Sequence, residues 1–217
     1  MNWIEFLFEY RDEVINRTIE HLFLVGISIS IAIIIGIPLG IFCTRNGLWC
    51  KIILGCANIF QTIPSLALFG FLIPLPILGG IGARTAIIAL ILYALLPIIR
   101  NTYTGIVNVD PAIREAGRGM GMTDRQLLFQ VELPLALGFI LAGVRVAIVI
   151  SVGVGTIAAA IGAGGLGTFI FAGVGMVNNQ LILLGAIPAA LMALVVDLTL
   201  GAIESRLAST ESRKKSP

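Results

Sequence analysis

Residues that could carry out chemistry are few in this sequence and do not gather. His21 is the only histidine, and the three cysteines, Cys43, Cys50 and Cys56, form no CxxC pair. A hydrolytic site needs a nucleophile beside a base, and a metal site needs several ligands close together. The sequence therefore predicts no catalytic residue, no metal site and no enzyme activity, including that of an intramembrane enzyme.

The longest polar stretch, residues 108–134, is instead typical of a surface that another protein contacts. Pro111 suits the first turn of a helix, with Asp110 as its cap. Asp124 can cap a second helix after a break at Gly121, and we expect Pro134 to end that helix. Two short helices around a glycine turn would project from the protein and could dock into a groove on a partner.

The elements that hold this stretch are apolar runs, which predict an all-α integral membrane protein. The 217 residues are 58% hydrophobic and 12% charged, whereas soluble domains average roughly 45–50% and about 25%. A hydrocarbon core about 30 Å thick needs about 20 apolar residues in a helix. We therefore expect about five transmembrane helices, at about residues 22–43, 52–72, 85–100, 135–160 and 181–203.

Basic residues predict the orientation of these spans. Lys and Arg concentrate in the first and third connections, with Arg100 as the end marker of the third span, and in the tail of residues 205–217. Cytoplasmic loops are enriched in these residues. We expect the N-terminus outside and the C-terminus in the cytoplasm, as an odd number of spans requires. The net charge of +2 indicates no nucleic-acid partner.

Residues 1–21 form a segment of their own in this interpretation. They mix acids such as Glu5 and Glu9 with large apolar residues such as Trp3 and Phe6. A signal peptide begins basic and then turns apolar, so this segment is not one. We expect an amphipathic helix that lies on the extracytoplasmic membrane surface.

Two charged residues, Arg145 and Asp197, fall inside the fourth and fifth expected spans. Charges inside a membrane are costly and usually paired. We place both in the cytoplasmic half, where they can form an ion pair that links two helices; direct contact with a solute is the alternative. Other polar residues in or beside spans are candidates for a translocation path, and they are Gln61, Thr62, Ser65, Ser151 and Thr156.

Glycines serve two expected purposes. Gly36 and Gly40 at helical spacing predict a close helix contact. Gly162, Gly164 and Gly167 fit the dinucleotide pattern GxGxxG, but an apolar span precedes them and the next acid is Asp197. We interpret them as a break between the fourth and fifth spans. Because irregular backbone at membrane depth is buried or lines an aqueous cavity, this stretch is a further candidate for the path.

The polar stretch carries a recognisable motif. It resembles the EAA motif of permease subunits of bacterial ABC importers, which reads EAA, three residues, G, nine residues, I, one residue, LP. At that spacing the chain has Glu115, Ala116, Gly117, Gly121, Val131, Leu133 and Pro134. It departs from the motif in having Gly117 for Ala and Val131 for Ile.

The resemblance covers nearly the whole chain. It implies a type I ABC importer permease of MetI-like architecture over residues 22–204, in the bacterial cytoplasmic membrane. The chain is most similar to permeases of osmoprotectant importers, which carry glycine betaine, carnitine, choline or proline betaine. The similar stretches are residues 61–66, 96–106 and 161–167.

The resemblance also implies partners. No GxxxxGK[ST] occurs in the chain, so ATP and Mg²⁺ would be bound by two copies of a separate ATPase subunit, and this chain would hold no cofactor. The helix around Glu115 to Gly121 would be the coupling helix seated on the ATPase, where Glu115 pairs with a basic residue or caps its own helix. We expect Gly117 and Gly121 to share a face that allows close approach. A second permease subunit, identical or similar, membrane lipid and an extracytoplasmic solute-binding protein complete the expected set.

Other functions stay open at this stage. Permeases for methionine or another small amino acid share the same plan. A secondary transporter would need an inverted repeat or a broken-helix pair together with ion ligands, and a channel would need a pore ring. We find no internal repeat and no such ring. ATP dependence of uptake would separate a secondary transporter from an ABC permease, and loss of transport on deletion of the ATPase gene would exclude a channel.

Overall fold

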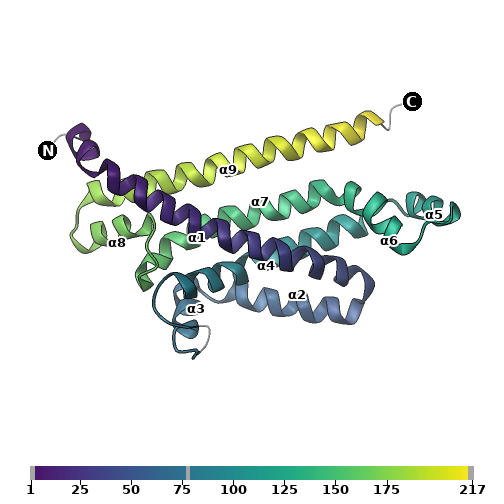
Figure 1. Ribbon diagram of the computed structural model, residues 1–217, viewed down its shortest axis with the longest axis horizontal. Coiled ribbons are helices and arrows are strands. Elements are labelled where there is room, and N and C mark those ends of the chain that lie inside the picture. Colours follow the sequence, from purple (N-terminus) through teal and green to yellow (C-terminus); the bar gives the residue numbers. More distant parts are fainter. Residues whose placement is uncertain (1–2, 77–78, 215–217) are drawn as a thin grey trace.

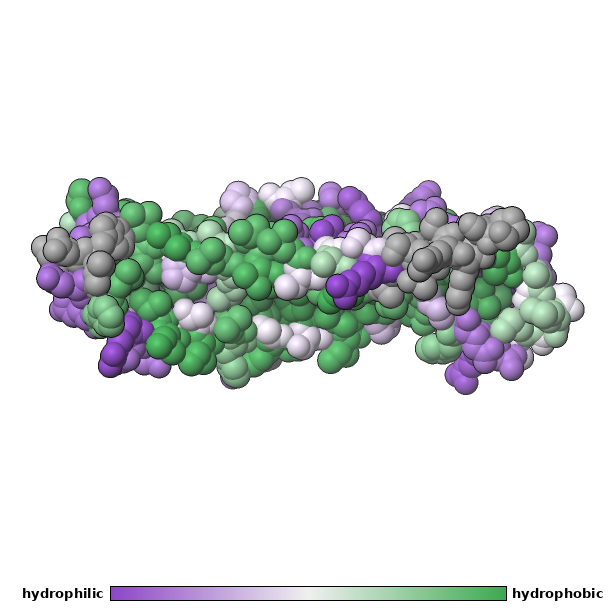
Figure 2. Space-filling view, turned by 90° about the horizontal axis from the view of Figure 1, so that it is seen from above, coloured by the Kyte–Doolittle hydropathy of each residue, from purple (hydrophilic) through white to green (hydrophobic). Residues whose placement is uncertain are grey.

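The computed structural model describes residues 3–76 and 79–214, and within them every regular element is a helix. Long helices run side by side along the molecule, with α8 near one end and α5 and α6 at the other (Figure 1). Green apolar residues cover much of the length of the face in Figure 2, while purple residues lie at both ends and in a smaller group near the middle. Four described helices are long and apolar enough to cross a membrane, or up to five if one bent pair is a single span.

The first helix, α1 (Trp3–Arg45), is 43 residues long and corrects the expected boundary at residue 21. Residues 3–21 are its first part and not a separate surface helix. No proline or glycine interrupts the chain before Gly26. The apolar side of this part has a protein partner, because Phe6 is buried in a cluster with Phe169, Leu181 and Leu184. Residues 1–2 lie outside the described residues.

The second expected span, residues 52–72, is two helices and not one. Helices α2 (Gly47–Thr62) and α3 (Ser65–Leu72) meet at 105°. Pro64 has no N–H to donate, and its ring drives the preceding residue out of the helical region. Ile63 accordingly has an extended backbone, and the hydroxyl of Tyr93 donates to its carbonyl oxygen.

Helix α4 (Ala83–Val107) continues past Arg100, which therefore does not mark its end. It packs closely on α1, and the glycines predicted to allow such contact do so. A Cβ atom on Gly36 would lie 2.8 Å from Cγ2 of Ile98, and one on Gly40 would lie 2.6 Å from Cβ of Thr102. The predicted close helix contact is confirmed.

The polar stretch forms two helices around a glycine turn, as predicted. Helix α5 (Pro111–Gly119) is followed by α6 (Asp124–Leu127), the π-helix η1 (Leu128–Glu132) and α7 (Leu133–Ile157).

Two details of this stretch differ from expectation. Thr123, not Asp124, caps α6, in a capping box with Gln126. Pro134 does not end a helix, because helical structure runs on from Asp124 to Ile161. The wider π turn before the proline displaces the carbonyls that its ring would otherwise meet.

The glycine-rich stretch breaks the chain between two spans, as expected. The 3₁₀-helix η2 (Ala158–Ile161) ends at Gly162, where φ is +73°, and Gly164 and Gly165 also have positive φ. Helix α8 (Gly167–Gly175) then leads to α9 (Asn179–Lys214). The expected tail from residue 205 therefore begins as helix, and residues 215–217 lie outside the described residues.

Candidate functional site

The projection made by α5 and α6 extends beyond the ends of α4 and α7 (Figure 1). The C-terminal ends of α1 and α9 lie toward this same end of the molecule. Pro111 occupies the first turn of α5, and Oδ1 of Asp110 accepts a hydrogen bond of 2.9 Å from the Ala112 amide. Local sequence thus determines where α5 begins, as predicted.

The first motif residues present one exposed surface on α5. Glu115 and Ala116 are exposed, as is Arg118. Asp110, not Glu115, caps the helix. The Glu115 carboxylate is therefore available to a partner's cation.

The two motif glycines do not share a face, contrary to expectation. Gly117 is buried against its own chain, where a Cβ atom would lie 2.8 Å from Cδ1 of Leu127 and 3.1 Å from the sulfur of Met122. Gly121 lies beyond the end of α5, with φ at +82° and open space where a Cβ atom would be. The spacing argument failed because α5 ends at Gly119. Gly117 permits packing of α5 on α6, and Gly121 permits the turn.

The last motif residues join the projection to the membrane helices. Leu133 packs against a buried cluster of α4 and α7 residues, namely Ile106, Ala136 and Ile140. Val131 is half-buried in η1, and Pro134 is exposed in the first turn of α7.

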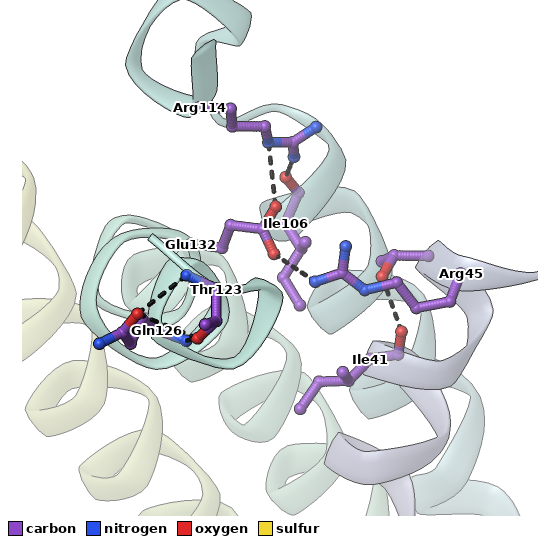
Figure 3. A network of polar contacts seen from close by, with 8 residues as sticks. Ile41, Arg45, Ile106, Arg114, Thr123, Gln126 and Glu132 are labelled. Carbon is purple, nitrogen blue, oxygen red and sulfur yellow. Dashed lines mark hydrogen bonds and ion pairs between the residues drawn. The ribbon is translucent and has the colours of Figure 1, made fainter. Parts of the chain in front are cut away.

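A buried carboxylate lies among these residues, and sequence reasoning missed it. Glu132 is 2% exposed. Its Oε2 atom lies 2.8 Å from Nη2 of Arg45, at the end of α1, and its Oε1 atom lies 3.2 Å from Nε of Arg114 on α5. Figure 3 shows both arginines pointing at the carboxylate, while Arg114 also donates to the carbonyl oxygen of Ile106 in the last turn of α4.

Glu132 occupies the variable position between Val131 and Leu133, so the motif assigns it nothing. A usable signal was present, because an acid directly before a long apolar run is costly unless it is paired.

The two charges predicted inside the spans are brought together by α7 and α9. Nη1 of Arg145 lies 3.7 Å from Oδ1 of Asp197, and Nη2 lies 3.2 Å from Oε2 of Glu204. A Cβ atom on Gly201 would lie 2.8 Å from Nη1, so this glycine makes room for the guanidinium. The second carboxylate was missed because it follows the expected end of the span.

Comparison with known protein families identifies the family of this chain. Residues 36–209 match the profile of the family described as "Binding-protein-dependent transport system inner membrane component". The chain belongs to this family. These permeases are transport subunits and not enzymes.

Curated relatives of this permease align over most of its length. It is 43% identical over 204 residues to the carnitine transport permease protein OpuCB of Listeria monocytogenes, covering 94% of this chain and 92% of that one. It is 44% identical over 199 residues to the osmoprotectant import permease protein OsmW of Salmonella typhimurium, covering 91% and 93%. The glycine betaine/carnitine/choline transport system permease protein OpuCD of Bacillus subtilis is 44% identical over 202 residues, covering 93% and 87%.

Solved structures share the fold of this permease. The MetNI methionine ABC transporter in inward-facing conformations matches with a TM-score of 0.79 at 23% identity, covering 89% of this chain and 96% of that one. An amino acid ABC transporter with histidines matches with a TM-score of 0.78 at 17% identity, covering 95% and 99%. The predicted all-α, MetI-like permease architecture is confirmed.

The polar residues suggested for the path of this permease occupy two places. Gln61, Thr62 and Ser65 flank the bend between α2 and α3, whereas Ser151 and Thr156 lie on α7. The hydroxyls of Thr62 and Thr156 donate to carbonyls of their own helices, those of Ile59 and Gly153. The Ser151 hydroxyl is buried and has no hydrogen-bond partner among the described residues.

Proposed function

We propose that this chain is the permease subunit of an ATP-driven importer of osmoprotectants in the bacterial cytoplasmic membrane. Its solutes would be glycine betaine, carnitine, choline or proline betaine. The observation that carries this assignment is the set of relatives at 40–44% identity across most of the chain, whose names specify carnitine, choline, glycine betaine or osmoprotectant transport.

Energy for import would come from a separate ATPase subunit in two copies, which bind ATP and Mg²⁺. The exposed surface of α5 with Glu115, Ala116 and Arg118 is the surface on which the ATPase would seat. The ion pair of Arg114 with Glu132 and its hydrogen bond to the carbonyl oxygen of Ile106 support this role, since they link α5 to the ends of membrane helices. Movement of α5 would then alter access to the path from either side.

The path itself would form between this chain and a second permease subunit, identical or similar. An extracytoplasmic solute-binding protein would deliver the solute. Recognition of a quaternary ammonium group relies on aromatic cages, and only 7% of this chain is aromatic. Most of the selectivity would therefore reside in the binding protein.

A methionine or other amino acid importer is the second candidate function. The fold shared with a methionine ABC transporter and an amino acid ABC transporter favours keeping it in the test. The two functions predict uptake of chemically distinct solutes.

Uptake measurements separate the candidates. A host lacking its own osmolyte importers would carry the complete operon, with this gene intact or deleted in frame, and would be assayed at raised osmolarity. Radiolabelled glycine betaine, choline and carnitine test the first function, and methionine and histidine test the second. Uptake of none of the three osmolytes, with uptake of an amino acid, would replace the first assignment by the second.

A further inference from the structure

We infer that Glu132 is a positioning residue that makes the cytoplasmic ends of α1, α4 and α7 follow the coupling helix α5. This inference rests on the proposed function, because it requires an ATPase that moves α5. Glu132 touches neither solute nor nucleotide in this role and acts through two arginines.

The first step is the way the carboxylate is shared. Each oxygen of Glu132 has its own cation, with Arg45 at 2.8 Å and Arg114 at 3.2 Å. The carboxylate is 2% exposed, whereas the side chains of Arg45 and Arg114 are 40% and 24% exposed. A buried carboxylate that loses one of its cations is left poorly compensated. The cluster therefore favours an arrangement in which both arginines stay in place.

The second step is the origin of the three side chains. Arg45 is the last residue of α1, Glu132 immediately precedes α7, and Arg114 belongs to α5. The Nη2 group of Arg114 also donates to the carbonyl oxygen of Ile106, in the last turn of α4 (Figure 3). One guanidinium thus holds α5 both to the end of α4 and, through Glu132, to α1 and α7.

The third step is that the backbone alone does not provide this connection. On its C-terminal side α5 is followed by the turn at Gly121, whose φ of +82° is a glycine conformation. Gly117 packs on Leu127 and Met122, both within the projection itself. Arg114 provides the polar side-chain link from α5 to the span ends. On its N-terminal side residues 108–110 join α5 to α4, and Val109 in this connection is buried. Without Arg114, α5 would keep this backbone connection to α4 but would lose its polar side-chain link to α1 and α7.

The π-helix η1 positions the Glu132 carboxylate at the start of α7. Glu132 is the last residue of η1, and the wider turn leads directly into Leu133, which packs in the buried cluster with Ile106. A π turn inside a longer helix often marks a functional position. The carboxylate therefore sits on a helical stretch that is continuous with α7, so in this inference a displacement of the carboxylate also displaces the end of that span.

The test uses the complete transporter, with its ATPase and second permease subunit, in liposomes supplied with the solute-binding protein. Solute uptake and ATP hydrolysis are measured together for the unaltered protein, Glu132→Gln and Arg114→Gln. We expect uptake per ATP hydrolysed to fall about tenfold in either variant. Lys51→Met, which removes an exposed cation at the same end of the molecule, is the control and should leave the ratio unchanged.

The double variant distinguishes a shared linkage from two separate defects. If Glu132 and Arg114 act as one unit, Glu132→Gln/Arg114→Gln should lose no more coupling than either single variant. Multiplied losses, or a ratio that stays at the unaltered level in complexes that retain the ATPase, would overturn the inference. Where Glu132→Gln prevents assembly, Arg114→Lys keeps the charge but lacks the two guanidinium nitrogens that reach Glu132 and the Ile106 carbonyl together. The same fall in uptake per ATP is then expected, and an unchanged ratio would overturn the inference.

A second measurement is independent of the solute. Hydrogen–deuterium exchange of the complete complex reports whether ATP changes protection at α5 and at the ends of α1 and α4 together. We expect joint changes in the unaltered protein and a change confined to α5 in Glu132→Gln. Joint changes in both proteins would contradict the role of Glu132. Failure of osmolyte uptake by the unaltered complex, with joint changes preserved, would contradict only the assignment of the solute.

Discussion

The Nε2 atom of His21 lies 3.1 Å from the carbonyl oxygen of Val152, a residue 131 positions later in the chain. Both residues are buried, and the imidazole ring fits against Gly155 and Gly165, where added Cβ atoms would lie 3.1 Å and 3.0 Å from ring atoms. The preceding residue, Glu20, accepts a 3.0 Å hydrogen bond from the Gly165 amide. The middle of α1 therefore holds both α7 and the glycine-rich break that follows it.

Replacing His21 by alanine should lower the stability of the permease by about 1–3 kcal/mol. The substitution leaves a cavity between α1 and α7 and removes the hydrogen bond to Val152. Thermal unfolding in detergent measures the change. Leu22→Ala is the matched control, since Leu22 is 51% exposed and should shift the midpoint little. Equal shifts for the two variants would show that the contact of His21 contributes no stability.

The glycine-rich break should not accept alanine at Gly165. Its φ of +77° is unfavourable for a residue with a Cβ atom, and that atom would lie 3.0 Å from Nδ1 of His21. The backbone strain alone costs about 1–2 kcal/mol. Gly175→Ala should be tolerated in the same unfolding assay, because a Cβ atom there meets nothing within 4 Å. A Gly165→Ala protein as stable as Gly175→Ala would contradict the turn geometry.

Gly117 should be sensitive to size, and its neighbour Gly119 should not. A branched side chain at Gly117 would push α5 away from Leu127, whereas a Cβ atom on Gly119 has nothing within 4 Å. We expect Gly117→Val to reduce co-purification of the ATPase with the permease at least about fivefold. Gly119→Ala is the control. Retention of the ATPase by both variants would mean that the packing of α5 does not determine the docking surface.

The bend between α2 and α3 should depend on the hydroxyl of Tyr93. This hydroxyl donates to the carbonyl oxygen of Ile63, which Pro64 leaves outside the helical hydrogen-bond pattern. Tyr93→Phe leaves the carbonyl without this donor and should cost about 1–3 kcal/mol in unfolding free energy. Tyr103→Phe, which removes the hydroxyl of a half-buried tyrosine on the same helix, should change stability less. The opposite order would show that the bend is held by packing alone.

Substitutions in the ion cluster between α7 and α9 should reduce the stability of the permease by unequal amounts. Arg145→Met leaves Asp197 and Glu204 near each other without their shared cation, so we expect it to destabilise the permease more than Asp197→Asn. Asp197 is 51% exposed and its contact of 3.7 Å is the longer one. Unfolding midpoints of Arg145→Met, Asp197→Asn and Glu204→Gln test this order. A greater loss for Asp197→Asn than for Glu204→Gln would reverse the assignment of the stronger partner.

The sequence by itself determined what depends on local chemistry and on the solvent. Long apolar runs predict helices that lie in a lipid bilayer. Asp110 and Pro111 begin a helix, Gly121 permits a turn, and Gly162 begins a break between helices. Each of these effects acts within a few residues. The spacing of the EAA-type motif likewise indicates the family to which the chain belongs. These predictions needed no knowledge of which helices are neighbours.

Only the tertiary structure decided which side chains converge. Arg45 and Glu132 are 87 residues apart, and their pairing depends on how the ends of α1 and α7 are placed. Long-range arrangement likewise decides that Gly117 packs against Leu127 and that Glu204 lies beside Arg145. It also provides the buried cluster against which the first part of α1 packs. The physical reason is that a buried charge or a missing side chain takes its role from the atoms that surround it. Those atoms come from distant parts of the chain, whose arrangement local patterns do not encode.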